Sequence, residues 1–185
     1  IISDNKDAEA TEPLTNGQEI TIDGKTGTYY IIVESCNSID ICSRFVSEPF
    51  YLDNTAPTIV YGTNGSSTYA KSRSTTITAS DSHSQVNTLK YITGTSNTAI
   101  PSTSLTNGGT VTISGVTGNY YVVSQACDKA GNCATLASNV FKMDNTKPTA
   151  TATVSGKSAS IVLKDSVALS GYQVTTSSSA TSYTT

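Results

Sequence analysis

Apolar and polar residues alternate in several short segments of the chain, and no segment repeats its apolar residues with sustained helical spacing. The alternation is strict over residues 110–114, as expected for a strand with one buried and one solvated face. The predicted strands include residues 75–79, 86–92, 110–114, 119–126 and 135–143. The last two are predicted to form a hairpin around residues 127–133. We therefore expect an all-β chain.

An internal repeat organises these strands. Residues 14–58 align with residues 105–149 without a gap at an offset of 91 residues, and 20 of the 45 positions are identical. Several substitutions keep the side-chain type, such as Ile20 to Val111 and Leu52 to Met143. Self-similarity at a fixed period is typical of an array of structural units. The sequence thus predicts tandem repeats with a period of about 91 residues.

The repeat also predicts the unit boundaries. An Asp-Asn-Thr-x-Pro segment occurs at residues 53–57 and again at 144–148. Asp and Asn favour turns and Pro interrupts strand pairing, so each segment is suited to connect two units. The chain divides into the C-terminal part of one unit (1–53), a complete unit (54–144) and the N-terminal part of a following unit (145–185). We expect it to be an interior stretch of a longer array.

The composition favours thin units over one large core. Hydrophobic residues make up 36% of the chain and charged residues 14%, and Ser and Thr together supply nearly a third. Thr, Val, Ile and Tyr suit a pleated, half-buried surface. Roughly seven strands per unit, with turn signals every 8–12 residues, predict an immunoglobulin-like β-sandwich.

A family resemblance gives the same prediction. Residues 118–132 read GNYYVVSQACDKAGN and residues 140–149 read VFKMDNTKPT. This pattern resembles the tandem bacterial Ig-like domains of large surface proteins, and the resemblance covers about half of the chain. It implies tandem Ig-like sandwiches at the cell surface, without implying a ligand, because this fold carries many functions. The first copy departs from the pattern at residues 37–41, which lack Ala-Gly-Asn.

The four cysteines occupy equivalent positions in the two copies: Cys36 and Cys42, Cys127 and Cys133. Each pair flanks a five-residue hairpin loop, which places the two residues opposite each other across a strand pair and suits a disulfide. The spacing is poor for zinc, and the chain has a single histidine. We predict two disulfides and hence an extracellular location.

Other features exclude several functions. The net charge is −3 and the basic residues are scattered, so nucleic acid is not an expected partner. No apolar run reaches the roughly 18–20 residues that span a bilayer, so no membrane insertion is expected. His83 lies among the serines of segment 81–84, where a solvated loop is the simpler interpretation than a nucleophile and base. We expect no catalytic residues, no cofactor and no enzyme activity.

Two binding chemistries remain to be weighed. The Asp-Asn pairs 53–54 and 144–145 suit turns, whereas calcium needs six to eight oxygens. One Asp at each junction supplies too few of these oxygens, although Asp128 or Asp40 would add more from a nearby loop. Our prediction is no metal site. For the Tyr pairs 29–30 and 120–121, one ring of each is expected in the core, because adjacent strand residues face opposite sides.

The function that these observations favour is a structural spacer in an adhesin-like protein of the bacterial surface. Its partners would be the neighbouring Ig-like repeats. One alternative is a filament subunit, in which copies of the chain complete each other's partial end domains. Another is a module that binds a glycan or a host cell-surface protein through loops 62–72, 80–87 and 128–132.

Overall fold

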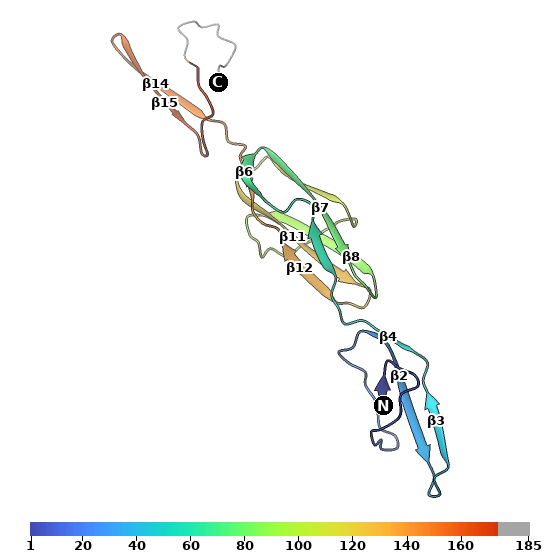
Figure 1. Cartoon of the computed structure of the whole chain (residues 1–185). Coiled ribbons are helices and arrows are strands. Elements are labelled where there is room, and N and C mark those ends of the chain that lie inside the picture. The colour runs from blue at the N-terminus through green and yellow to red at the C-terminus, as the bar shows by residue number, and fades with distance from the viewer. Residues whose placement is uncertain (174–185) are drawn as a thin grey trace.

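The computed structural model describes residues 1–173, and this range contains strands and no helix. Three groups of strands follow one another along an elongated molecule, with β1 near one end and the hairpin β14–β15 near the other (Figure 1). The first group lies within residues 1–53, the central group within 54–144 and the third within 145–173. Residues 174–185, the end of the third segment, lie outside the described residues. The all-β prediction is confirmed for the described part of the chain.

The strands of the first group are β1 (Ile2–Ser3), β2 (Gly27–Cys36), β3 (Cys42–Val46) and β4 (Phe50–Leu52). The central group contains β5 (Thr58–Tyr61), β6 (Ser66–Ala70), β7 (Ser72–Ser80), β8 (Val86–Gly94), β9 (Thr103–Ser104), β10 (Thr110–Ser114), β11 (Gly118–Asp128), β12 (Cys133–Ala137) and β13 (Phe141–Met143). The third group is the hairpin of β14 (Thr149–Ser155) and β15 (Ser158–Lys164).

The central group is a sandwich of two sheets. One sheet has the order β10-β7-β5, and the other has the order β6-β13-β11-β8-β9, with β12 also paired to β11. All pairings in these two sheets are antiparallel except that of β13 with β6. Strand β10 has the predicted bounds, and its alternating burial pattern gives it one buried face.

The core lies between the two sheets. Its members alternate along their strands, as side chains on one face of a strand must. The buried members are Ile59 and Tyr61 of β5, Ile77 and Ala79 of β7, Val111 and Ile113 of β10, Leu89 of β8, Val122 and Ala126 of β11, and Phe141 and Met143 of β13. This single cluster holds the two sheets together.

Tyr61 adds a polar link across the core. Its side chain is 7% exposed, and its hydroxyl lies 2.7 Å from the Leu136 carbonyl oxygen. The same oxygen lies 3.0 Å from Ser124 Oγ and 3.0 Å from the Val122 carbonyl oxygen. A hydroxyl has one proton, so we assign the Tyr61 hydroxyl as the donor to the Leu136 carbonyl oxygen. The Ser124 hydroxyl then donates to the Tyr61 oxygen. The link joins β5 of one sheet to β11 and β12 of the other.

One predicted strand is divided in the structure. Residues 135–143 were expected to be continuous, but β12 ends at Ala137 and β13 begins at Phe141. Between them the buried Ser138 accepts a hydrogen bond from the Val122 amide through its Oγ (2.9 Å). A side chain therefore replaces a backbone ladder partner at this point, and both halves still pair with β11.

The chain changes sheets between β5 and β6, and Gly65 is required there. Gly65 has a φ of 83°, and a Cβ would lie 2.6 Å from Asn139 Cβ and 2.8 Å from the Val140 carbonyl oxygen. Only glycine combines this conformation with such a close approach of two backbones. Neighbouring Asn64 accepts a hydrogen bond from the Asn139 amide (2.7 Å).

The first group of strands parallels the second half of the central sandwich. Strands β2, β3 and β4 begin at residues 27, 42 and 50, and β11, β12 and β13 begin at residues 118, 133 and 141, so each pair is 91 residues apart. The side-chain bond of Ser138 to Val122 has its counterpart in that of Ser47 to the Ile31 amide (2.9 Å). The shared local structure follows from the shared sequence.

The first group lacks a second sheet within the described residues. Residues 19–23 lie 91 residues before β10, but they form no strand. In the central group β10 is paired with β7, whereas residues 1–26 contain no strand that matches β7. As a result Phe50 is 40% exposed, while Phe141, its counterpart, is 1% exposed.

Candidate functional site

Both predicted disulfides are present. Cys36 is bonded to Cys42 and Cys127 to Cys133, and no described cysteine is free. In each case the two residues are direct partners at the end of a hairpin, in the register β2–β3 or β11–β12. The bonds therefore clamp the hairpin tips, as the spacing predicts.

The disulfide of the central unit should contribute a modest share of its stability. Closing so short a loop restricts the unfolded chain by about 2 kcal/mol in the chain-entropy estimate. We expect the double variant Cys127→Ser, Cys133→Ser to lower the free energy of unfolding by about this amount. Denaturant titration with and without a reductant measures it, and the reductant should lower the stability of the central unit in the wild type but not in the variant, whose remaining bond, Cys36–Cys42, lies in the first group of strands. A wild-type unfolding curve that a reductant leaves unchanged would contradict this assignment.

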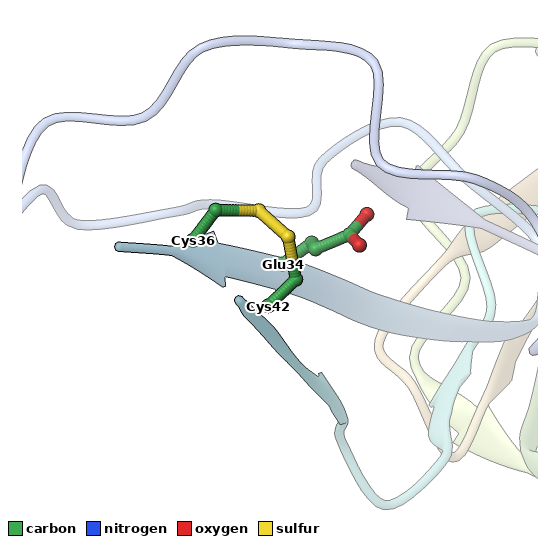
Figure 2. A group of neighbouring side chains, drawn as sticks. All are labelled: Glu34, Cys36 and Cys42. Atoms are coloured by element: carbon green, nitrogen blue, oxygen red, sulfur yellow. A yellow bond between two sulfur atoms is a disulfide. The ribbon is translucent and has the colours of Figure 1, made fainter. Parts of the chain in front are cut away.

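The first hairpin tip also brings a carboxylate close to the sulfurs. Figure 2 shows the Cys36–Cys42 bridge between β2 and β3, with Glu34 on β2, the strand that carries Cys36. Candidate ligand atoms of the three residues lie within 4.8 Å of one another, and all three residues are exposed. Metals bind thiolates, whereas these sulfurs are bonded to each other. The group is a structural clamp with an exposed glutamate beside it.

A second cluster consists of carboxylates alone. Asp53, Asp81 and Asp128 each place an oxygen within 4.8 Å of the others. Asp128 is 2% exposed, and Asp53 and Asp81 are half-buried. We call these three residues the junction triad, because Asp53 belongs to the linker between the first and central groups of strands.

The fold explains why residues so distant in sequence meet. Asp81 directly follows β7, and Asp128 ends β11. Strand β8 begins just after the Asp81 loop, and its first residue, Val86, is the register partner of Asp128. The Lys129 amide also donates to the Gln85 carbonyl oxygen (3.1 Å). Loops 81–85 and 128–132 therefore lie side by side at the end of the sandwich that faces the linker.

The linker is hydrogen-bonded to both loops. Asp53 Oδ2 accepts from the Ser84 amide (3.0 Å), and the Asp53 carbonyl oxygen accepts from Asn132 Nδ2 (3.0 Å). Asp53 Oδ1 accepts from the Thr55 amide (3.0 Å), which forms the turn expected of an Asp-Asn-Thr segment. Pro57, at the end of the linker, is buried. The first junction is thus packed against the central sandwich.

Hydrogen bonds keep two members of the triad ionised. The Ser84 side chain and the Thr55 amide hold the pKa of Asp53 below its ordinary value. Burial raises the pKa of Asp128, and so does the charge of Asp53, but hydrogen bonds from the side chain and amide of Asn132 outweigh both and leave it lowered. Two carboxylates of like charge therefore face each other at neutral pH.

Within residues 1–173, the two basic side chains next to the triad in sequence are hydrogen-bonded to other groups. Lys129 follows Asp128 in the chain, but its Nζ donates to Gln85 Oε1 (2.7 Å). The Ser84 side-chain hydrogen bond is the largest cause of the lowered pKa of Asp53, and the charge of His83 is the smallest. The His83 ring nitrogen Nδ1 contacts the neighbouring Ser82 Oγ (2.8 Å).

The remaining residues singled out from the sequence lie elsewhere. Asp40 belongs to the loop after Cys36, whereas the linker follows Leu52, which pairs with Gly27 at the opposite end of β2. Among the paired tyrosines, Tyr120 packs against the core, as expected of one ring of each pair.

Asp128 and Asp40 were the two loop aspartates considered as possible neighbours of this junction. Asp128 is the one that lies beside Asp53, and the presence of Asp81 was not predicted.

The first group of strands has a groove of about 840 Å³ beside β2. Apolar residues in its lining include Ile2, Leu14, Ile20 and Ile32. In the central sandwich, the sheet β10-β7-β5 covers the corresponding face of β11. The groove takes lining residues from both faces of β2, because Ile32 and Val33 are adjacent along the strand.

Within residues 1–173, no helix combines the length and the apolar character needed to cross a membrane. Comparisons with protein-family models, with curated proteins and with solved structures give no significant match.

Proposed function

We propose that this chain is part of an extracellular structural spacer, in which Ig-like sandwiches stacked end to end hold another part of a bacterial surface protein away from the cell. The observation that carries the proposal is the junction between the first and central groups. A five-residue linker there is hydrogen-bonded to two loops of the next unit. Such a connection limits bending, whereas a free Gly-Ser linker would not.

Three further observations support the proposal. The strand groups follow one another along one direction (Figure 1), as an extended stalk requires. The central unit has two sheets, with the strand orders β10-β7-β5 and β6-β13-β11-β8-β9. This division is compatible with an Ig-like sandwich. Two disulfides within short hairpins suit an oxidising environment outside the cytosol.

The location can be tested on cells of the source organism. An antibody raised against the chain should label intact, unpermeabilised cells, and mild protease treatment of those cells should remove the signal. An antibody against a cytosolic protein serves as the control and should label only permeabilised cells. Labelling that requires permeabilisation would contradict the surface location.

The spacer role also predicts the absence of a dedicated ligand. We expect no saturable binding of the chain to a glycan array or to host extracellular proteins. The exposed Tyr51 and Tyr69 provide the sharpest check, because sugars stack on exposed aromatic rings. Saturable glycan binding that is lost in Tyr51→Ala or Tyr69→Ala would favour the binding module instead.

The groove beside β2 supports a second candidate, the filament subunit. Its apolar lining matches the exposed Val154, Ile161 and Val162 of the β14–β15 hairpin, so the hairpin of one copy would cover the groove of the next. A head-to-tail contact of this kind generates open filaments. Sedimentation velocity should then show concentration-dependent growth that Ile161→Asp abolishes. A monomer at all concentrations would exclude this candidate.

A further inference from the structure

We propose that Asn16 is a site of spontaneous deamidation, and that the fold protects its repeat counterpart, Asn107, from the same reaction. The chain has three Asn-Gly pairs, at residues 16–17, 64–65 and 107–108. Asparagine reacts fastest when glycine follows it, because glycine carries no side chain that would hinder the attacking backbone nitrogen. The first and third pairs lie 91 residues apart, each within the sequence Leu-Thr-Asn-Gly.

The reaction is a cyclisation followed by a hydrolysis. The Gly17 amide nitrogen gives up its proton to solvent base and attacks Cγ of Asn16, so a new N–Cγ bond forms. The Cγ–Nδ2 bond breaks, and its nitrogen takes up a proton and leaves as ammonia. Water then opens the five-membered succinimide at either carbonyl, which yields aspartate or isoaspartate. The net change is the exchange of ammonia for water, so the solvent supplies everything that the reaction needs.

The first and third pairs form the same turn. The carbonyl oxygen of Thr15 accepts from the Gln18 amide (3.0 Å), and that of Thr106 accepts from the Gly109 amide (2.8 Å). The glycine that follows the asparagine has a φ of 84° in the first turn and 82° in the second. A positive φ is what this turn position requires of glycine. Neither the local sequence nor the local backbone therefore distinguishes the two asparagines.

Strand β7 holds both reacting groups of the third pair. Asn107 Oδ1 accepts from the Ala79 amide (2.8 Å), and its Nδ2 donates to the Ala79 carbonyl oxygen (2.8 Å). The amide nitrogen of Gly108, which would be the nucleophile, donates to the Ile77 carbonyl oxygen (2.9 Å). The Asn107 side chain must leave Ala79, and the Gly108 amide must leave Ile77, before the nitrogen can attack Cγ. Reaction at Asn107 thus requires a local opening of the fold.

The first pair is not held in this way. Within residues 1–173, neither the Asn16 side chain nor the Gly17 amide is hydrogen-bonded to another group of the protein, and both residues are exposed. The reason is the missing strand, because residues 1–26 contain no counterpart of β7. Solvent base therefore reaches the nitrogen, and the side chain is free to rotate into the geometry of attack.

The pair at residues 64–65 is held by a different segment. Asn64 Oδ1 accepts from the Asn139 amide (2.7 Å), and Gly65 lies close to the backbone of residues 139–140. The Asn64 side chain must break this bond before it can rotate. We therefore expect Asn64 to react slowly, as Asn107 does.

Deamidation would change the groove beside β2. Asn16 and Gln18 belong to its lining, and so do the acidic residues Glu12, Glu19 and Glu34. Either product adds a negative charge to this lining, and isoaspartate also lengthens the backbone of the turn by one carbon. A strand that held Asn16 as β7 holds Asn107 would suppress the reaction. The rate at Asn16 therefore reports whether this side of the groove is covered, and the reaction itself is independent of the spacer role.

The test follows the three sites in one sample of the folded 185-residue chain. The protein is incubated in mildly alkaline buffer at physiological temperature and then digested, and mass spectrometry measures the gain of about one dalton at each asparagine. Trypsin releases residues 7–25, in which Asn16 is the one asparagine. We expect Asn16 to react about tenfold or more faster than Asn107 and Asn64, because even a small cost of local opening slows a reaction by this factor. Asn16→Gln should abolish the signal in this peptide and leave the circular dichroism spectrum unchanged.

The unfolded chain is the matched control. In concentrated urea the two Leu-Thr-Asn-Gly segments lose their different surroundings, so Asn16 and Asn107 should react at equal rates. Two results would overturn the proposal: equal rates at Asn16 and Asn107 in the folded chain, or a rate difference that persists in urea. The first would show that β7 gives no protection, and the second that the fold does not cause the difference. Neither result bears on the surface location or on the spacer role.

Discussion

Replacing Phe141 with alanine should lower the free energy of unfolding of the central sandwich by about 3–5 kcal/mol. Phe141 is 1% exposed and lies in the cluster that joins the two sheets. Truncating such a side chain removes its transfer free energy and leaves a cavity that the close-packed neighbours fill only in part. Native-state hydrogen exchange at the amides of β11 measures the loss in this unit alone.

The chain provides a matched control for this experiment. Phe50 occupies the equivalent position 91 residues earlier and pairs with Tyr29, as Phe141 pairs with Tyr120. Because Phe50 is 40% exposed, Phe50→Ala should change the stability of its own strands by about 0.5 kcal/mol or little more. Equal losses at the two positions would show that the first group is closed by a second sheet, contrary to its structure here.

The second large effect is expected from Tyr61→Phe. The substitution keeps the ring in the core but removes the hydroxyl that contacts the Leu136 carbonyl oxygen and Ser124 Oγ. Those groups would remain in a largely water-free site without this partner, which typically costs about 1–3 kcal/mol. The free energy of unfolding from denaturant titration of wild type and variant gives the difference.

A pH titration tests the burial of the Tyr61 hydroxyl. Burial raises the pKa of Tyr61 above its ordinary value of 10.0, partly offset by hydrogen bonding to Ser124. A group with a raised folded-state pKa contributes stability that is complete below the unfolded pKa and is lost as the pH rises through the folded one. The wild type should therefore lose stability above about pH 10 more steeply than Tyr61→Phe.

The control for the hydroxyl is Tyr69→Phe, since Tyr69 is 45% exposed. Removing the Tyr69 hydroxyl should change the free energy of unfolding by no more than about 0.5 kcal/mol. If Tyr61→Phe were as stable as this control, the cross-sheet link would carry no net stabilisation.

The sequence was most informative where local pattern decides the structure. Strict alternation over residues 110–114 predicted β10 with its observed bounds, because a single buried face determines that segment. The spacing of Cys127 and Cys133 predicted their disulfide, because a hairpin sets the distance between its two ends. In both cases the determining residues are close together in sequence.

Features that depend on distant partners were not predicted. The division of residues 135–143 depends on Ser138 reaching the Val122 amide, which requires knowledge of the strand register. The absence of a strand over residues 19–23 depends on a missing neighbour, although the apolar pattern resembles that of β10. The local pattern of apolar and polar residues predicts neither the strand register nor the absence of a neighbouring strand.

The junction triad shows the same limit. From the sequence, one aspartate per linker is too few oxygens for calcium. Asp81 becomes a candidate only once β8 is known to pair with β11, which brings the loop before β8 to the end of β11. Its position directly after a strand, in a loop that leads into the next strand, was the one local signal available.

Small-angle X-ray scattering of the chain in solution tests the spacer account most directly. The comparison is with a variant that carries a flexible Gly-Ser insertion after Thr55, which frees the linker from the Ser84 and Asn132 contacts. We predict that the wild type scatters as one extended particle, and that the insertion changes the profile to that of units moving independently. A wild-type profile as flexible as that of the variant would contradict the account, because a linker that bends freely cannot hold a stalk extended.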